Sequence, residues 1–192
     1  MRARDVIELL VLSVLWGGAY LFTRAAVPDF GPAPLVALRL GIAALVLLPL
    51  VAARGLLPQM RRHAPTLLLV GVPFTALPFL LMTWGALHIT AGVSAVLNAT
   101  APMFAALIAF FVLKERLGRW RVAGLVIGFA GVSWLTSGGP VAMRSGLGLL
   151  AVGALLVVSL IWSVGATVTR RRLADVDPLV TTTGTLAAAS LV

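Results

Sequence analysis

The sequence predicts an all-α transmembrane protein made of inverted five-helix repeats, and three observations lead to this fold class. Apolar residues make up 60% of the 192 residues and charged residues only 11%, with a mean hydropathy of +1.08. Soluble domains are about half apolar and a quarter charged. Uncharged apolar segments of membrane-spanning length recur along the chain, and a segment near the N-terminus recurs 146 residues later. A soluble globule and a disordered chain are both excluded.

Six apolar segments reach the roughly 20 residues that a bilayer-spanning helix needs. They cover residues 6–26, 34–53, 65–87, 90–113, 122–139 and 146–169. A seventh segment begins at Pro178 and ends with the chain at Val192. At 1.5 Å per residue it covers about 22 Å of the ~30 Å hydrocarbon layer. We therefore expect six full helices and a partial seventh, in a chain that is cut within its second repeat.

Basic residues separate the apolar segments, and their distribution predicts the orientation. When loops are assigned alternately to two sides, twelve Arg and Lys residues fall on one side. Only Arg24 and Arg144 fall on the other, and Arg39 lies within a span. The positive-inside rule then places the N-terminus in the cytoplasm. Glu8 and Trp16 within the first segment favour a retained helix over a cleaved signal peptide.

The charge pattern also bears on partners. A net charge of +9 would suit nucleic acid if the basic residues formed one face, but they punctuate apolar runs, so the partner is the lipid bilayer and not nucleic acid. Cys is absent and neither His has a second ligand at metal spacing, so we expect no metal and no cofactor. Nothing in the sequence decides for or against a homodimer.

An internal repeat relates the start of the chain to its end. With an offset of 146 residues, seven of the 22 positions from 11 to 32 are identical, against about two expected from composition. The identical residues include Trp16 with Trp162, Thr23 with Thr169, and Pro32 with Pro178. Since the offset spans five helices, an odd number, the second copy enters the membrane in the opposite direction. Inverted repeats are typical of secondary transporters, which bind substrate between the halves.

Several short motifs occur in an order that resembles one known family. They are Trp16-Gly17-Gly18, Pro34 with Arg39, residues 85–94 (GALHITAGVS), Pro102, residues 114–117 (KERL), and Gly124 with residues 128–132 (GFAGV). Together they resemble the drug/metabolite transporter superfamily, in particular its EamA-type permeases. The resemblance implies a first repeat over residues 6–140 and an incomplete, inverted second repeat over 146–192. It also implies a bacterial inner (plasma) membrane exporter of amino acids and other small metabolites, with ten helices when complete.

Arg39 is the one charge clearly inside a span, where an Arg costs roughly 2.5 to 3.5 kcal/mol on insertion scales. It would serve as a counter-charge, because a guanidinium can hold a substrate carboxylate through two hydrogen bonds. The alternative is that it snorkels to the outer interface or ties neighbouring helices together.

Other candidate substrate contacts lie on the first, fourth and sixth spans. Ser94 and Asn98 belong to a polar stripe with Thr90 and Pro102, and Pro102 leaves the Asn98 carbonyl without its usual donor. Trp16 and Tyr20 lie one helical turn apart, too deep for interfacial anchors. Trp162 on the sixth span is a further candidate substrate contact. Interhelical packing is the alternative for these residues, including packing of Trp16 and Trp162 against the opposing repeat.

Proline residues predict helix kinks at Pro73, Pro78 and Pro102. For Pro73 and Pro78 in the third span, one interpretation is a kink that allows gating, and the other is ordinary helix packing.

Two other function classes compete with transport. Residues 92–94 and 131–133 (GVS in both) superficially match an intramembrane serine protease, but no His lies in any span to activate a serine, so we expect no enzyme. A purely structural membrane protein would not explain an inverted repeat. The predicted function is export of small polar metabolites, amino acids above all, by alternating access. Export of small hydrophobic or cationic drugs, or a non-transporting fragment, are the alternatives.

The acidic residues bear on energy coupling. All six lie at predicted helix ends or in loops, and Arg39 stays charged, so the first repeat has no evident proton carrier. Since alternating access needs two repeats, we expect the 192-residue chain to insert into a membrane without catalysing transport.

The predicted orientation can be tested by labelling single cysteines, since the chain has no Cys of its own. Positions 59 and 114 should face the cytoplasm, and positions 88 and 139 should face outward. In intact cells an impermeant thiol reagent should label Cys only at the outward positions. Labelling at position 59 would contradict the orientation.

Overall fold

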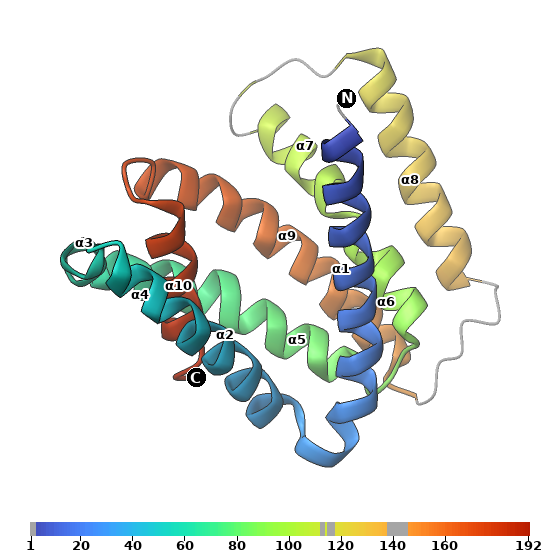
Figure 1. The fold of residues 1–192 in the computed structure, drawn as a ribbon. Helices are drawn as coiled ribbons and strands as arrows, with labels where there is room; N and C mark the ends of the chain where they lie inside the picture. The colour runs from blue at the N-terminus through green and yellow to red at the C-terminus, as the bar shows by residue number, and fades with distance from the viewer. Residues whose placement is uncertain (1–2, 112–113, 115–117, 138–145) are drawn as a thin grey trace.

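The computed structural model describes residues 3–111, 114, 118–137 and 146–192, and these residues form helices, turns and no strands. Five helical segments of this described part are long and apolar enough to cross a membrane, so the protein is a multi-pass membrane protein. Figure 1 shows the helices as a splayed bundle in which α9 and α10 lie against the helices of the first half of the chain. The predicted all-α transmembrane class is confirmed.

The elements follow one another along the chain with short connections. They are α1 (Ala3–Phe30), α2 (Pro32–Ala53), α3 (Leu57–Arg62), α4 (Ala64–Gly71), the π-helix η1 (Val72–Ala76), α5 (Leu77–Gly85), α6 (Ala91–Asn98), α7 (Ala101–Phe111), α8 (Arg119–Ser137), α9 (Gly148–Arg172) and α10 (Pro178–Ala189).

The predicted spans coincide with these helices to within a few residues. The fifth predicted span, residues 122–139, lies largely in α8, which is not among the five candidate spans found within the described residues. Residues 138 and 139, where that span was expected to end, lie outside the described residues. The partial seventh segment forms α10, which is 12 residues long.

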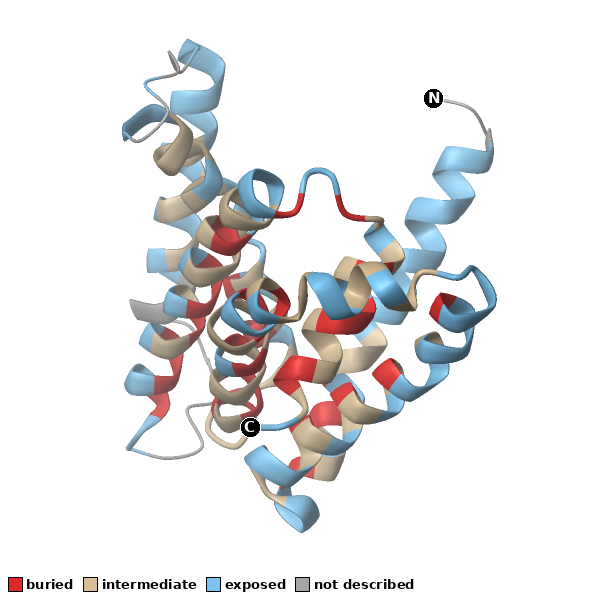
Figure 2. Cartoon of the chain, turned by 90° about the vertical axis from the view of Figure 1, so that its left-hand side faces the viewer, coloured by how far each residue is buried: buried red, intermediate tan, exposed pale blue. Residues whose placement is uncertain are grey.

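A tight turn joins the first two helices. Gly31 has a φ of 76°, in the left-handed region that glycine adopts without steric cost. Pro32 follows in the first turn of α2, where its missing N–H would have no partner in any case. The C-terminal half of α1 contains its buried residues and α1 packs on α2, α5 and α6. The N-terminal half of α1 is exposed (Figure 2), including apolar residues such as Ile7 and Leu10.

The third span is continuous but changes its helical type in the middle. Between α4 and α5 the backbone forms the π-helix η1, which contains Pro73, and Leu77 donates its N–H to the carbonyl of Val72. Pro78 follows in the first turn of α5. A π-helical segment inside a longer helix is frequently found at functional sites.

The fourth span, expected as one helix, is divided into α6 and α7 by a turn at Ala99 and Thr100. Serine residues of α9 hydrogen-bond to carbonyl groups on either side of this turn. The Ser159 hydroxyl donates to the carbonyl of Leu97 at 3.2 Å, and the Ser163 hydroxyl donates to that of Ala101 at 2.8 Å. The Leu97 carbonyl also accepts from the N–H of Thr100 at 3.1 Å and from its hydroxyl at 2.6 Å. The break in the helix is thus stabilised both by the turn itself and by α9, as a polar backbone group in a membrane requires.

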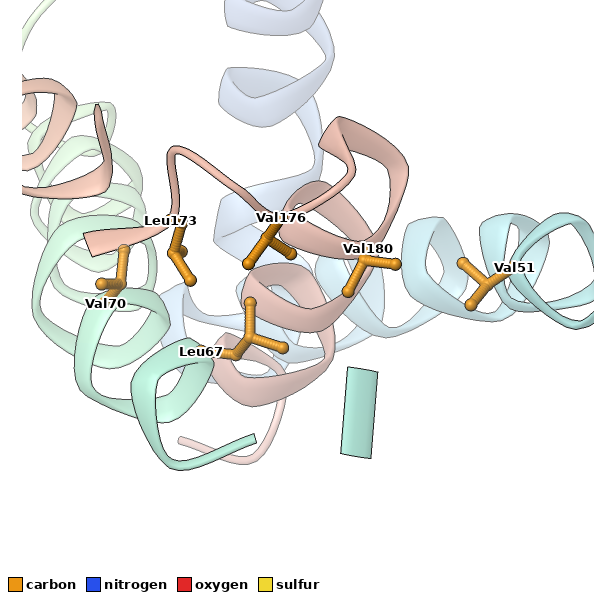
Figure 3. Close-up of a cluster of buried hydrophobic side chains, with 6 residues drawn as sticks. All are labelled: Val51, Leu67, Val70, Leu173, Val176 and Val180. Atoms are coloured by element: carbon orange, nitrogen blue, oxygen red, sulfur yellow. The ribbon is translucent and has the colours of Figure 1, made fainter. Parts of the chain in front are cut away.

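A hydrophobic cluster joins the end of α2 to the connection between α9 and α10. Figure 3 shows its six buried members, which are Val51, Leu67, Val70, Leu173, Val176 and Val180. Gln59 adds polar contacts there, donating to the carbonyl of Asp175 and accepting from the N–H of Asp177, each at 3.4 Å. The α2–α3 and α9–α10 connections therefore lie at the same end of the bundle, as the predicted alternation of loops requires.

Close contact between α4 and α10 depends on a glycine. A Cβ atom at Gly71 would lie 2.7 Å from the carbonyl oxygen of Thr185 and 2.9 Å from the Cβ of Ala188. Both atoms belong to or adjoin the backbone of α10, so they cannot turn away as a flexible side chain could. At Gly153 on α9, in contrast, an added Cβ would meet nothing within 4 Å outside the backbone of its own helix.

We predict that Gly71→Ala destabilises the protein, because overpacking of this kind costs about 1–3 kcal/mol. The matched variant Gly153→Ala should be neutral or stabilising by up to about 1 kcal/mol, since Ala has the higher helix propensity. Thermal unfolding of the two variants in the same detergent checks this. An equal Tm for both would contradict the close approach of α4 and α10.

Candidate functional site

Arg39 on α2 contacts two other helices and is half-buried. Its guanidinium donates a hydrogen bond to the Thr23 hydroxyl of α1 at 3.1 Å. Its Cζ atom lies 5.1 Å from the ring centroid of Phe79 on α5, which is a cation–π distance. Among the described residues no carboxylate forms a salt bridge with Arg39. The contacts show that Arg39 ties three helices together, and they leave most of its five N–H groups for other partners.

Aromatic side chains connect Phe79 to the C-terminal helices. Trp162 on α9 packs edge-to-face on Phe79, with centroids 5.8 Å apart, and edge-to-face on Trp16 of α1 at 6.0 Å. The two tryptophans that the internal repeat relates are therefore in direct contact. This contact agrees with the packing alternative for Trp16. Trp162 contacts the Phe79 ring, and Phe79 in turn contacts the guanidinium of Arg39.

Tyr20 and Thr23 lie on the same face of α1, one helical turn apart. Thr23 is buried, and besides accepting from Arg39 it donates to the carbonyl of Ala19 at 2.7 Å. The Tyr20 side chain is 8% exposed, and its hydroxyl is buried without a hydrogen-bond partner in the described structure. A buried unpaired polar group costs about 1–3 kcal/mol, so its presence calls for a reason.

The candidates of the fourth span have separate surroundings. Ser94 is buried, and its hydroxyl donates to the carbonyl of Thr90 one turn earlier, at 3.1 Å. Asn98 ends α6, and its side-chain oxygen is buried without a partner among the described residues. The partners that Arg39 contacts, Thr23 and Phe79, lie on other helices than these two residues. Their assignment to the site stays a prediction.

A cavity of about 260 Å³ lies between η1, α9 and α10, and Trp162 lines it. Five threonines contribute to its wall, together with Phe74 and small residues of α9. They are Thr75, Thr169, Thr181, Thr182 and Thr185. We call this space the threonine pocket. Trp16, Tyr20 and Arg39 are not among its lining residues.

Sequence reasoning missed Thr23, Phe79 and the threonine pocket as parts of this region. Thr23 could have been identified from the sequence, because it is one of the positions identical in the internal repeat. Nothing in the sequence distinguishes Phe79, since an aromatic residue in an apolar helix is ordinary. Three of the pocket threonines lie on α10, the segment that the sequence presented as a partial helix.

Comparison with known proteins shows which protein family the chain resembles. Residues 5–137 match the family model described as the EamA-like transporter family. The chain is 29% identical over 140 residues to the "Probable terminal-alkyne amino-acid exporter" of Streptantibioticus cattleyicolor. The aligned region covers 72% of this chain and 47% of that protein. It is 28% identical over 189 residues to the uncharacterized transporter YyaM of Bacillus subtilis, covering 94% of this chain and 60% of that one.

A second Bacillus subtilis protein, the uncharacterized transporter YdfC, is 30% identical over 142 residues, which is 72% of this chain and 45% of YdfC. The chain thus spans about half the length of the curated relatives it matches. No solved structure matches it at a significant level.

The hydrogen bonds on α1 predict opposite effects of two similar substitutions. Tyr20→Phe removes a hydroxyl that has no partner in the described structure, so the Tm should stay level or rise. Thr23→Val removes the acceptor of Arg39 and the donor to Ala19, and should lower stability by about 1–2 kcal/mol. Thermal unfolding of both variants in detergent measures the difference. A Tyr20→Phe protein that unfolds as readily as Thr23→Val would show that the hydroxyl has a structural partner.

Proposed function

Because the chain belongs to the EamA-like transporter family, we propose that it serves as an inner-membrane permease that exports small polar metabolites, amino acids or related compounds above all. In this proposal solute binds between two inverted halves and is released by alternating access, with the N-terminus in the cytoplasm. The first half comprises residues 6–140, and residues 146–192 begin the second.

The observation that carries the substrate class is Arg39. A guanidinium at membrane depth is held by neutral partners, the Thr23 hydroxyl and the Phe79 ring, and by no carboxylate of the described residues. A permanent positive charge of this kind attracts the carboxylate of a solute, which can form two parallel hydrogen bonds with it. The same charge repels cationic drugs, so it supports anionic or zwitterionic solutes over that alternative.

The aromatic contacts support the placement of the site between the halves. Trp16 and Trp162 occupy equivalent positions in the proposed repeats and meet edge-to-face. Secondary transporters bind their solutes near the midplane at such a repeat interface. Phe79 contacts both Trp162 and Arg39, so the proposal puts Arg39 beside the region where a solute would bind.

A test compares two ligands that differ only in the carboxylate. The chain is reconstituted in lipid nanodiscs, and binding of L-methionine is compared with binding of 3-methylthiopropylamine, the same molecule without its carboxylate. We expect L-methionine to bind more tightly by about 10- to 100-fold, because hydrogen bonds to charged groups contribute roughly 1.5–3 kcal/mol. In Arg39→Gln, whose amide can still donate to Thr23, the two affinities should become similar.

The control is Arg62→Gln, which removes an exposed arginine at the end of α3 and should leave the ratio unchanged. Equal binding of both ligands by the unaltered chain would overturn the carboxylate role of Arg39. Tighter binding of the amine, increased further in Arg39→Gln, would support export of cationic compounds instead.

A further inference from the structure

We infer that the threonine pocket is the part of the solute site that holds a neutral hydrogen-bonding group, such as an amide, at the far end of a solute whose carboxylate is held by Arg39. This inference rests on the proposed function and specifies the solutes further. It would make the chain selective for amino acids with amide or hydroxyl side chains over apolar ones.

The first argument is the hydrogen-bonding state of the pocket hydroxyls. Threonine in a transmembrane helix ordinarily donates to a carbonyl of its own helix. Thr185 does so, to the carbonyls of Thr181 at 2.8 Å and Thr182 at 3.1 Å, which leaves the lone pairs of its oxygen free to accept. Thr75, Thr169 and Thr182 have no side-chain hydrogen bond within the described part of the chain. The wall therefore offers both donors and acceptors to a ligand.

The second argument is the charge of the wall. None of the residues that line the pocket is charged. A carboxylate or an ammonium group placed there would find no counter-ion among the lining residues. A primary amide has two donors and an acceptor, and a threonine hydroxyl can pair with either. The lining thus favours a neutral polar group.

The third argument is the size of the space and its origin. In the proposed repeat, the positions of Tyr20 and Arg39 in the first half correspond to Ala166 and Thr185 in the second, and both of these line the pocket. Ala166 and Thr185 have smaller side chains than Tyr20 and Arg39. The cavity of about 260 Å³ lies below the roughly 300–1,000 Å³ of drug-sized ligand sites, so it suits one end of a small solute.

The fourth argument is position. Phe79 contacts the guanidinium of Arg39 and the ring of Trp162, a pocket residue. Leu186, which also lines the pocket, packs in the same cluster as Phe79. Arg39 and the pocket are therefore linked through one aromatic ring. In this proposal the solute lies along the Phe79 ring, with its carboxylate at Arg39 and its amide in the pocket.

The test uses L-glutamine and L-methionine, which have unbranched side chains of similar length and differ in hydrogen-bonding capacity. Binding of each by the chain in nanodiscs is measured by equilibrium dialysis with radiolabelled ligand. We expect L-glutamine to bind about 3- to 10-fold more tightly, the range for one neutral hydrogen bond gained in a site with matching partners. Thr182→Val and Thr185→Val should each reduce this ratio towards one while leaving L-methionine affinity unchanged.

Thr183→Val is the matched control on the same helix. The Thr183 side chain is 1% exposed and lines a different, apolar groove between α2, α4 and α10, and its hydroxyl has no partner in the described structure. Its replacement removes no hydrogen bond of the described residues, so the fold and the L-glutamine preference should both persist. The Tm of each variant is measured alongside to verify folding.

The outcomes separate this inference from the proposed function. Binding of neither amino acid would overturn the proposed function and this inference with it. Binding of both with equal affinity, or a preference for L-glutamine that survives in Thr182→Val and Thr185→Val, would overturn the inference alone. Loss of the preference in Thr183→Val to the same degree would also overturn it, because that hydroxyl lies outside the pocket.

Discussion

The absence of water from the hydrocarbon layer is the constraint on which the rest of this structure depends, since each polar group there needs a partner inside the protein. The break between α6 and α7 is accommodated because Thr100 in the turn and Ser159 and Ser163 of α9 donate to the carbonyls beside it. Arg39 is accommodated because Thr23 accepts from it and Phe79 presents its ring face. The same constraint makes the exceptions informative, because the Tyr20 hydroxyl and the Asn98 side-chain oxygen are buried without partners in the described structure.

Local patterns in the sequence were sufficient for the helices but not for their interruptions. Apolar length and the positions of Arg and Lys predicted the described spans to within a few residues. The fourth span was expected as one helix, because the sequence does not show that Thr100 hydrogen-bonds back to Leu97 or that Ser159 of α9 reaches the same carbonyl. For α8 the sequence pattern and the structure agree on a helix.

For the candidate site too, the sequence predicted individual residues but not the residues they contact. Arg39 could be identified because a lone charge in an apolar segment is costly wherever it lies. Its partners Thr23 and Phe79 come from other helices, and only tertiary structure brings them within contact distance. Ser94 and Asn98 were linked by their spacing of four residues, yet the Ser94 hydroxyl donates within its own helix whereas the Asn98 oxygen has no described partner. Helical spacing places two side chains on one face, but it does not determine what that face meets.

The proposed repeat explains how one scaffold can bind the two ends of a solute differently. Some equivalent positions are identical in the two copies. Thr23, which contacts Arg39, matches Thr169 of the threonine pocket, and the prolines that begin α2 and α10 also match. Other positions near the proposed site differ, since Tyr20 and Arg39 correspond to Ala166 and Thr185. Two copies with the same residues there would present the same chemistry to both ends of a solute. In the proposed site the charge of Arg39 lies in the first copy and the neutral cavity lies between the two copies, so a solute with one acidic end and one neutral polar end would have a single favoured orientation.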